Sequence, residues 1–296
     1  MSTRMKDWYH YAQGECSVRM LVDTALEEFV REVSRPDPEI NLSRAVFVMG
    51  MFEYPDLDVA GYESKLDDLA ESAARAAPED TALALAQYLF NQLGFQGNAE
   101  HYMDPRNSYL NEVLERRLGI PISLSVLYIE VARRLGLRAY GVGLPGHFIV
   151  RVTESHGDLS EPVFLDPFHG GEPMTEEDCR ARVEAITQGS LPFDPVFLNP
   201  VGARFILTRM LNNLKNVYAS AQDFNHARHV VERLLVVNPD NPEEIRNLGL
   251  IYSALGQSRK AIMLLNDYLA VRPNSPDAQT IRQHIADLSD RLARWN

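Results

Sequence analysis

A 34-residue repeat near the C-terminus constrains the fold of this 296-residue chain more than any other feature. Residues of one type recur at this separation in four pairs, namely Leu214 and Leu248, Tyr218 and Tyr252, Ala227 and Ala261, and Pro239 and Pro273. A fixed period of this length is typical of stacked helix pairs, in which each unit buries its apolar face against its neighbours. The prolines mark the unit ends, because proline cannot continue a helix.

The period and the residue types resemble the tetratricopeptide repeat. The second copy fits better than the first, because Gly249 stands beside Leu248 whereas Lys215 takes the glycine's position one period earlier. The amphipathic stretch 275–295 is expected to form a capping helix over the second repeat. Two repeats rarely stand alone, so we expect them to pack on the rest of the chain. They serve either as scaffold only or as a concave groove for a peptide or a partner helix.

Charge and composition exclude several classes of protein. The net charge is −12, which repels phosphate backbones, so we do not expect nucleic acid as a partner. The N-terminus lacks the apolar stretch of a signal peptide, and the longest apolar run, 45–52, is too short to span a bilayer. These features predict a cytoplasmic protein without a membrane partner. Cys16 and Cys179 form no CxxC pair, so neither a disulfide framework nor a structural zinc site is expected.

The chain is predicted to have three regions with a predominantly helical α+β fold: a helical N-terminal region at 1–93, a core at 94–204 and the repeats at 205–296. Between 18 and 93 the apolar residues recur at spacings of three and four, which indicates amphipathic helices. In the core, Asn107 or Ser108 is expected to cap a helix that runs through Arg117 and ends at Gly119. Pro121 suits the first turn of the next helix, because its missing N–H needs no partner there.

After this helix the apolar period becomes that of strands, in the runs 137–144, 147–152 and 162–168. A helix followed by antiparallel strands predicts an α+β core. The same order, with a histidine at one strand and an aspartate at the next, is similar to the transglutaminase-like, papain-type superfamily. The resemblance implies a triad in which a cysteine at the helix start is the nucleophile, shares a proton with His147 and is supported by Asp166. The cysteine position is Pro121 in this chain, so the resemblance implies that the nucleophile is lost.

The stretches 97–137, 141–148 and 165–171 closely resemble the SirB-like family, which joins a transglutaminase-like core to tetratricopeptide repeats. Its members are described as regulatory or uncharacterised. We therefore expect a non-catalytic regulatory or adaptor protein that binds a protein or peptide partner, without a cofactor. The first of these stretches contains four polar residues that we expect to fix the loop before the core helix by capping and Asx-type turns, namely Asn98, Tyr102, Asp104 and Asn107.

The alternative is a hydrolase or acyltransferase in which a serine works with His147 and Asp166. Ser125 shares the helix face of Pro121 one turn deeper, whereas Ser123 points elsewhere. Both serines are otherwise expected to bond back to a carbonyl one turn earlier. We expect a hydrogen bond between His147 and Asp166, since a buried imidazole needs a partner.

Three further side chains belong to residue types that can bind a metal or act as a nucleophile. His169 adds a second imidazole, but its spacing matches no ligand motif, so no metal site is predicted. Cys179 is expected on a surface helix away from His147, and Cys16 lies near the N-terminus. Neither is expected to be a catalytic thiol.

Overall fold

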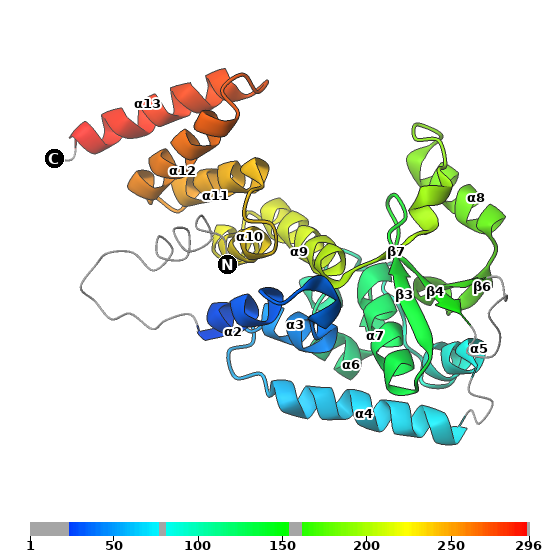
Figure 1. Cartoon of the computed structure of the whole chain (residues 1–296). Helices are drawn as coiled ribbons and strands as arrows, with labels where there is room; N and C mark the ends of the chain where they lie inside the picture. Colours follow the sequence, from blue (N-terminus) through cyan, green and yellow to red (C-terminus); the bar gives the residue numbers. More distant parts are fainter. Residues whose placement is uncertain (1–23, 77–80, 154–161, 295–296) are drawn as a thin grey trace. The chain divides into compact units, whose positions relative to one another are not determined.

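The computed structural model describes residues 24–76, 81–153 and 162–294 (Figure 1). The chain divides into two compact units, one formed by Met1–Ser34 with Leu211–Asn296 and the other by Arg35–Met210. The predominantly helical α+β class predicted from the sequence is confirmed. The three predicted regions, with boundaries after residues 93 and 204, remain a prediction. Within the described residues, no helix is long and apolar enough to cross a membrane.

The N-terminal part of the unit Arg35–Met210 is helical, as the spacing of its apolar residues predicts. It contains η1 (Asp37–Glu39), α3 (Leu42–Met49), α4 (Val59–Ala76), α5 (Ala82–Ala86) and the π-helical turn η2 (Gln87–Gln92). Side chains cap two of these helices: Asn41 accepts the N–H of Arg44, and Thr81 accepts that of Ala84. The helix α4 buries only one face, through Leu66 and its neighbours, as an amphipathic helix does.

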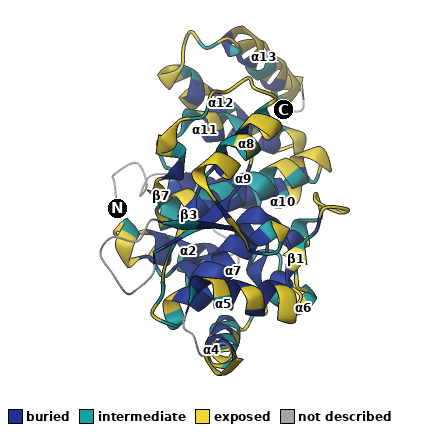
Figure 2. Cartoon of the chain, turned by 90° about the vertical axis from the view of Figure 1, so that its right-hand side faces the viewer, coloured by how far each residue is buried: buried dark blue, intermediate teal, exposed yellow. Residues whose placement is uncertain are grey.

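The core helix α7 (Pro121–Arg134) follows a short segment of helices and strands, which comprises β1 (Gln96–Gly97), η3 (Pro105–Asn107), α6 (Leu110–Arg116) and β2 (Leu118–Gly119). The sequence prediction for α6 was wrong at both ends. Tyr109 precedes the helix without a side-chain cap, and Arg117 ends it in the left-handed conformation with a φ of 57°. Pro121 does occupy the first turn of α7, whose residues from Pro121 to Ala132 are all buried (Figure 2).

A five-stranded antiparallel sheet packs beside α7. Its order is β6–β5–β4–β3–β7, with β3 at Arg138–Val142, β4 at Ile149–Thr153, β5 at Val163–Asp166, β6 at Glu172–Met174 and β7 at Pro200–Val201. The three longest strands fall in the predicted runs. The two edge strands were not predicted, because they are short and contain Pro173 and Pro200, and proline is confined to positions that need no ladder donor.

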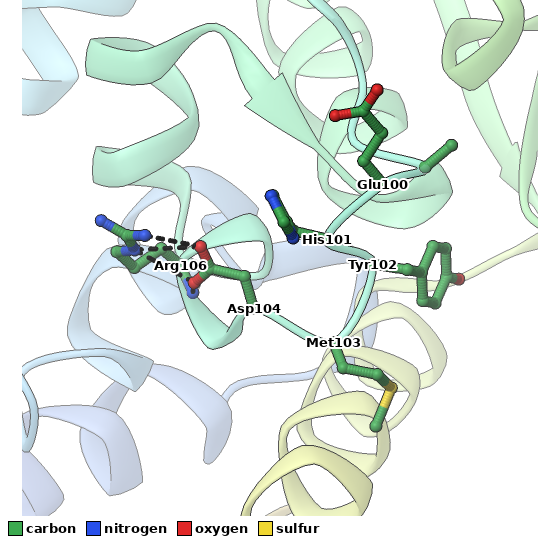
Figure 3. Close-up of a pocket in the computed structure, with 7 residues that line it drawn as sticks. Glu100, His101, Tyr102, Met103, Asp104 and Arg106 are labelled. Carbon is green, nitrogen blue, oxygen red and sulfur yellow. Dashed lines mark hydrogen bonds and ion pairs between the residues drawn. The ribbon is translucent and has the colours of Figure 1, made fainter.

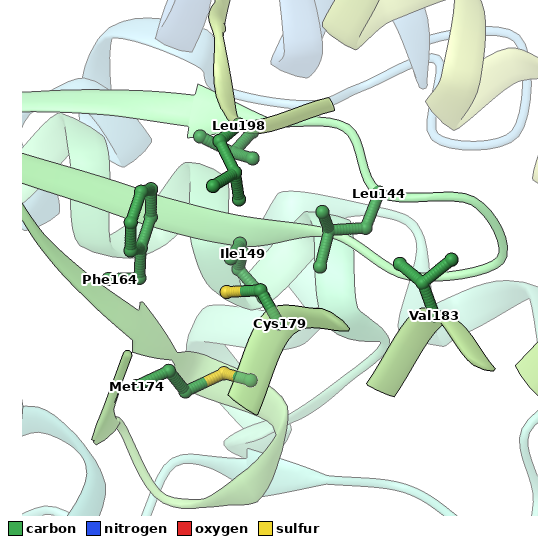
Figure 4. Close-up of a cluster of buried hydrophobic side chains, with 8 residues drawn as sticks. Leu144, Ile149, Phe164, Met174, Cys179, Val183 and Leu198 are labelled. Carbon is green, nitrogen blue, oxygen red and sulfur yellow. The ribbon is translucent and has the colours of Figure 1, made fainter. Parts of the chain in front are cut away.

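The helix α8 (Glu176–Thr187) covers one face of this sheet and precedes the short turn η5 (Pro195–Leu198). Thr175 and Asp178 form a capping box at its start. Cys179 is fully buried among Ile149, Met174 and other apolar side chains (Figure 4). The helix α8 lies at the surface, as expected, but Cys179 is on its buried face, which completes the core.

The other unit, which contains the repeats, comprises α2 (Thr24–Val33), the part of α9 (Ala203–Ser220) from Leu211 onward, α10 (Phe224–Val237), α11 (Pro242–Ala254), α12 (Ser258–Val271) and α13 (Ala278–Arg294). Successive helices from α10 to α13 pack on one another, and α2 packs on α10. The two repeats therefore pack on a helix from the N-terminal part of the chain, as expected because two repeats rarely fold alone. The amphipathic α13 confirms the predicted capping helix, with Ile281 and Leu288 buried.

Equivalent positions of the two repeats are buried alike. Leu214, Tyr218 and Ala227 are at most 6% exposed, and so are Leu248, Tyr252 and Ala261 one period later. A Cβ on Gly249 would approach Leu265 to 2.9 Å, so this position needs a small residue between α11 and α12. Lys215 at the equivalent position of the first repeat instead forms an ion pair with Glu244.

Candidate functional site

The loop before the core helix is held by two buried asparagines. The Nδ2 of Asn98 donates to the Oδ1 of Asn107 over 3.0 Å, and the Nδ2 of Asn107 donates to the carbonyl of His101 over 2.7 Å. The backbone N–H of His101 donates in turn to the Oδ1 of Asn98. These bonds confirm the loop-fixing role expected for the asparagines.

Asp104 completes the loop. Its carboxylate accepts the backbone N–H of Arg106 and pairs with the side chains of Arg106 and Arg116. The hydrogen bond from Arg106 holds the pKa of Asp104 below its usual value. Residues 99–104 and 106 line a surface hollow of about 640 Å³ (Figure 3). Within it the Tyr102 ring points away from the Asp104–Arg106 pair, and Tyr102 and Met103 remain 43% and 51% exposed.

His147 stands at the end of the tight loop 143–147, just before β4. Gly146 takes a φ of 72° in this loop, a backbone conformation that favours glycine. The guanidinium of Arg209 donates to the carbonyls of Leu144 and His147 over 2.9 and 3.1 Å. Burial lowers the pKa of Arg209. Sequence reasoning missed Arg209, because nothing in its neighbourhood distinguishes it from other helical arginines.

Asp166 ends β5, the strand that pairs with β4, and this pairing brings it beside His147. The Nε2 of His147 lies 2.8 Å from the Oδ2 of Asp166, and the two side chains are 5% and 1% exposed. The hydrogen bond predicted between them is therefore confirmed. The other carboxylate oxygen of Asp166 accepts the N–H of Phe168 and caps the turn η4 (Pro167–His169).

A second imidazole and an arginine complete the cluster. The Nδ1 of His169 also lies 2.8 Å from the Oδ2 of Asp166. Arg182, on α8, places its Nη1 3.0 Å from the Nδ1 of His169 and its Nη2 3.5 Å from Asp166. Sequence reasoning missed Arg182. No local pattern marks it, because its approach to Asp166 depends on which face of α8 meets the sheet.

The electrostatics of the cluster are those of an ionised carboxylate between donors. Burial alone would raise the pKa of Asp166, but the hydrogen bonds and charges of His147 and His169 hold it below its usual value. The ligand atoms of Asp166, His147 and His169 lie within 4.8 Å of one another. However, both imidazoles point a nitrogen at the same carboxylate oxygen, and Arg182 adds a positive charge. The set suits a hydrogen-bonded cluster better than a cation site.

The two candidate serines are fully buried in α7 and hydrogen-bonded to carbonyls. Ser125 donates to the carbonyl of Pro121 over 2.7 Å, which is the one-turn back-bond expected from the sequence. Ser123 donates to the carbonyl of Asn107 over 2.6 Å and accepts the N–H of Ile120. No hydrogen bond joins either serine to His147 within the described part of the chain.

The cysteines offer no reactive thiol in the described residues. Burial, followed by the nearby carboxylates of Asp178 and Asp166, raises the pKa of Cys179 to about 12. Cys16 lies outside the residues that the structure describes.

Comparison with known families matches two parts of the chain. Residues 60–212 match the transglutaminase-like superfamily, and residues 214–286 match the tetratricopeptide repeat. The UPF0162 protein of Xylella fastidiosa strain 9a5c is 41% identical over 86% of this chain and 92% of its own length. The UPF0162 protein of Vibrio cholerae is 29% identical over 70% of this chain and 75% of its own length.

Two further similarities are more distant. F-box only protein 21 of Homo sapiens is 29% identical over 58% of this chain, which corresponds to 28% of its own length. A crystal structure of menin matches with a TM-score of 0.35 and 12% identity over 83% of this chain and 68% of that chain. This TM-score is too low to support a conclusion about the fold or the function of this chain.

Proposed function

The chain belongs to the UPF0162 family and to the transglutaminase-like superfamily, and from this premise we propose that it is a non-catalytic regulatory or adaptor protein. It binds protein or peptide partners through its repeats, through the cleft of its core, or through both. The repeats favour this role, because stacked helix pairs commonly bind other proteins. The SirB-like assignment, a cytoplasmic location and the three-region division at residues 93 and 204 belong to the same proposal.

One observation carries the proposal. The first turn of α7, where the superfamily resemblance puts a nucleophilic cysteine, holds Pro121, which has no reactive group. His147 and Asp166 keep their hydrogen bond without it. A buried imidazole gains stability from a carboxylate partner whether or not it takes part in catalysis, so this bond does not require an enzyme.

The competing function is a hydrolase or acyltransferase that uses Ser125 or Ser123. Fluorophosphonate labelling followed by intact-mass analysis separates the two. We expect no adduct on the folded wild-type chain under conditions that label a serine protease in the same tube. An adduct that disappears in both Ser125→Ala and His147→Ala would overturn the proposal, since it would show a serine activated by the histidine.

The binding surface is tested by crosslinking in source-cell lysate, identification of the captured protein and a binding measurement with both purified components. Leu250 is 39% exposed on α11, and Leu191 is 40% exposed in the other unit. Leu250→Glu weakens binding if the repeats hold the partner, whereas Leu191→Glu is the matched control. Weakening by His147→Ala instead would assign the partner to the core. Equal binding by all the variants would contradict the proposal that the partner binds at either surface.

A further inference from the structure

The helix α8 covers only one end of its face of the antiparallel sheet. At that end Val142 of β3 and Ile149 of β4 lie opposite each other, in the apolar cluster that Cys179 completes (Figure 4). Successive side chains of a strand point to opposite faces, so Tyr140 and Arg138 lie on the same face as Val142. Tyr140 is 44% exposed and Arg138 is also exposed. This end of the face is therefore open to solvent.

The neighbouring strand places a second arginine at the open end. Arg151 of β4 is directly opposite Tyr140, and Thr153 is directly opposite Arg138. Opposite residues of antiparallel strands point to the same face, so Arg138, Tyr140 and Arg151 lie together. The two arginines are diagonal neighbours, a relation that separates their positions by about 7–8 Å. We call these three side chains the arginine patch.

The two arginines of the patch differ from the other cations of this unit. Every other lysine and arginine after Arg35, up to Met210, forms an ion pair with a carboxylate or donates to a backbone carbonyl. Such pairing is expected where acidic side chains outnumber basic ones by 41 to 29. Within the described ranges 24–76, 81–153 and 162–294, neither Arg138 nor Arg151 has a partner of this kind. Two neighbouring like charges repel each other, so this arrangement favours an added anionic group.

The donor chemistry of the patch suits carboxylates. A guanidinium has five N–H donors in a planar fork and no acceptor, and it binds a carboxylate through two parallel hydrogen bonds. Tyr140 adds a phenolic donor and the apolar surface of its ring. An extended peptide presents side chains on one face at every second residue, which is a spacing of about 6.6 Å. This spacing is close to the separation of the two arginines.

A nucleic acid suits the patch less well than an acidic peptide. Its affinity comes from many phosphate contacts, whereas the patch offers two cations in a chain of net charge −12. A short acidic segment needs only the two local contacts.

We propose that the arginine patch binds an extended acidic segment of a partner protein. Two carboxylates of this segment, two residues apart, pair with Arg138 and Arg151, and the segment packs on the ring of Tyr140. The inference goes beyond the proposed function, because the patch contains no residue of the repeats or of the His147 cluster. Affinity falls as the salt concentration rises, since exposed ion pairs are screened.

The test is fluorescence anisotropy with a labelled hexapeptide that alternates Glu and Thr, and with a matched peptide in which Gln replaces Glu. The Glu peptide should bind about tenfold more tightly than the Gln peptide at low salt. Arg138→Gln and Arg151→Gln should each weaken binding of the Glu peptide about fivefold. Arg75→Gln is the matched control, because Arg75 is an exposed arginine of α4 whose loss changes the net charge equally. It should change affinity less than about twofold, since distant exposed charges are screened. Circular dichroism of each variant excludes loss of folding.

Three results would overturn the inference: equal affinity for the Glu and Gln peptides, an equal loss in Arg75→Gln and the patch variants, or no binding of the Glu peptide at low salt. Tighter binding of a single-stranded oligonucleotide than of the Glu peptide would also overturn it and would assign the patch to nucleic acid. Each of these results leaves the test of the proposed function unchanged, because Leu250→Glu and His147→Ala do not alter the patch.

Discussion

Replacing Asp166 by asparagine should destabilise the core by about 3 kcal/mol. The exchange keeps the shape and the oxygen that accepts the N–H of Phe168, but it removes the charge that holds the two imidazoles. A buried charge-assisted hydrogen bond contributes about 1.5–3 kcal/mol, and His147 makes such a bond. The bond to His169 adds at most about 1 kcal/mol, because the side chain of His169 is 45% exposed.

The chain contains a matched control for this variant. Asp194 also precedes a proline at the start of a short 3₁₀ turn and also accepts the N–H two residues later, but no histidine is bound to it in the described structure. Asn is as good a cap as Asp, so Asp194→Asn should change stability by less than about 0.5 kcal/mol. The difference between the two variants therefore measures what the buried charge of Asp166 contributes through His147, His169 and Arg182.

Hydrogen exchange followed by mass spectrometry measures the effect locally, which avoids assuming that the whole chain unfolds in one step. Amides of β4 and β5 should exchange about a hundredfold faster in Asp166→Asn, since 1.4 kcal/mol corresponds to a factor of ten. Equal exchange in Asp166→Asn and Asp194→Asn would refute the reasoning, because it would mean that the buried charge adds nothing to stability.

Four further predictions concern separate parts of the chain. The contribution of Asp166 is present above its ordinary pKa of 3.8 and is lost as the pH falls through the lowered folded value. The protection factors of the β5 amides, corrected for the intrinsic exchange rate at each pH, should therefore fall in acid in the wild type but not in Asp166→Asn. Ser123→Ala should lower the free energy of unfolding by about 1–3 kcal/mol, because it leaves buried backbone groups without a partner. Ser125→Ala should lower it by less than about 1 kcal/mol. Urea unfolding compares the two variants, and the reverse order would contradict these hydrogen bonds. Iodoacetamide should alkylate Cys179 at pH 8 only as fast as the core opens, so moderate urea should accelerate the reaction, and rapid labelling of the native chain would contradict its burial. Gly249→Val should lower stability by about 2 kcal/mol through overpacking against Leu265, measured by thermal unfolding, and an unchanged melting temperature would show that α11 and α12 can separate at no cost.

The sequence was most informative where a local rule acts alone. The 34-residue period predicted the paired burial of Tyr218 and Tyr252, because identical helix pairs pack identically. Pro121 was placed at a helix start by its missing N–H, which is a property of the residue itself. The bond between His147 and Asp166 was predicted from the order of two adjacent strands.

The sequence was least informative where distant segments meet. Arg182 reaches Asp166 from α8 only after the sheet has folded, and no local pattern marks this contact. Cys179 was predicted to lie on a surface helix, but which of its side chains are buried depends on the face of α8 that meets the sheet. The end of α6 at Arg117 was missed, because a non-glycine residue in the left-handed conformation is uncommon.

The most direct test of the central claim is to put a thiol at the start of α7. Because burial at Pro121 slows alkylation, the iodoacetamide rate of each variant at pH 7 is expressed relative to its own rate at alkaline pH. This relative rate should be higher for Pro121→Cys than for Pro242→Cys, which occupies the corresponding position of α11. Peptide-resolved mass spectrometry separates these thiols from Cys16 and Cys179. The account predicts that His147→Ala removes the difference in relative rate. Equal relative rates in the two single variants, or a difference that persists without His147, would contradict the claim that Pro121 marks the vacated nucleophile position of a retained site.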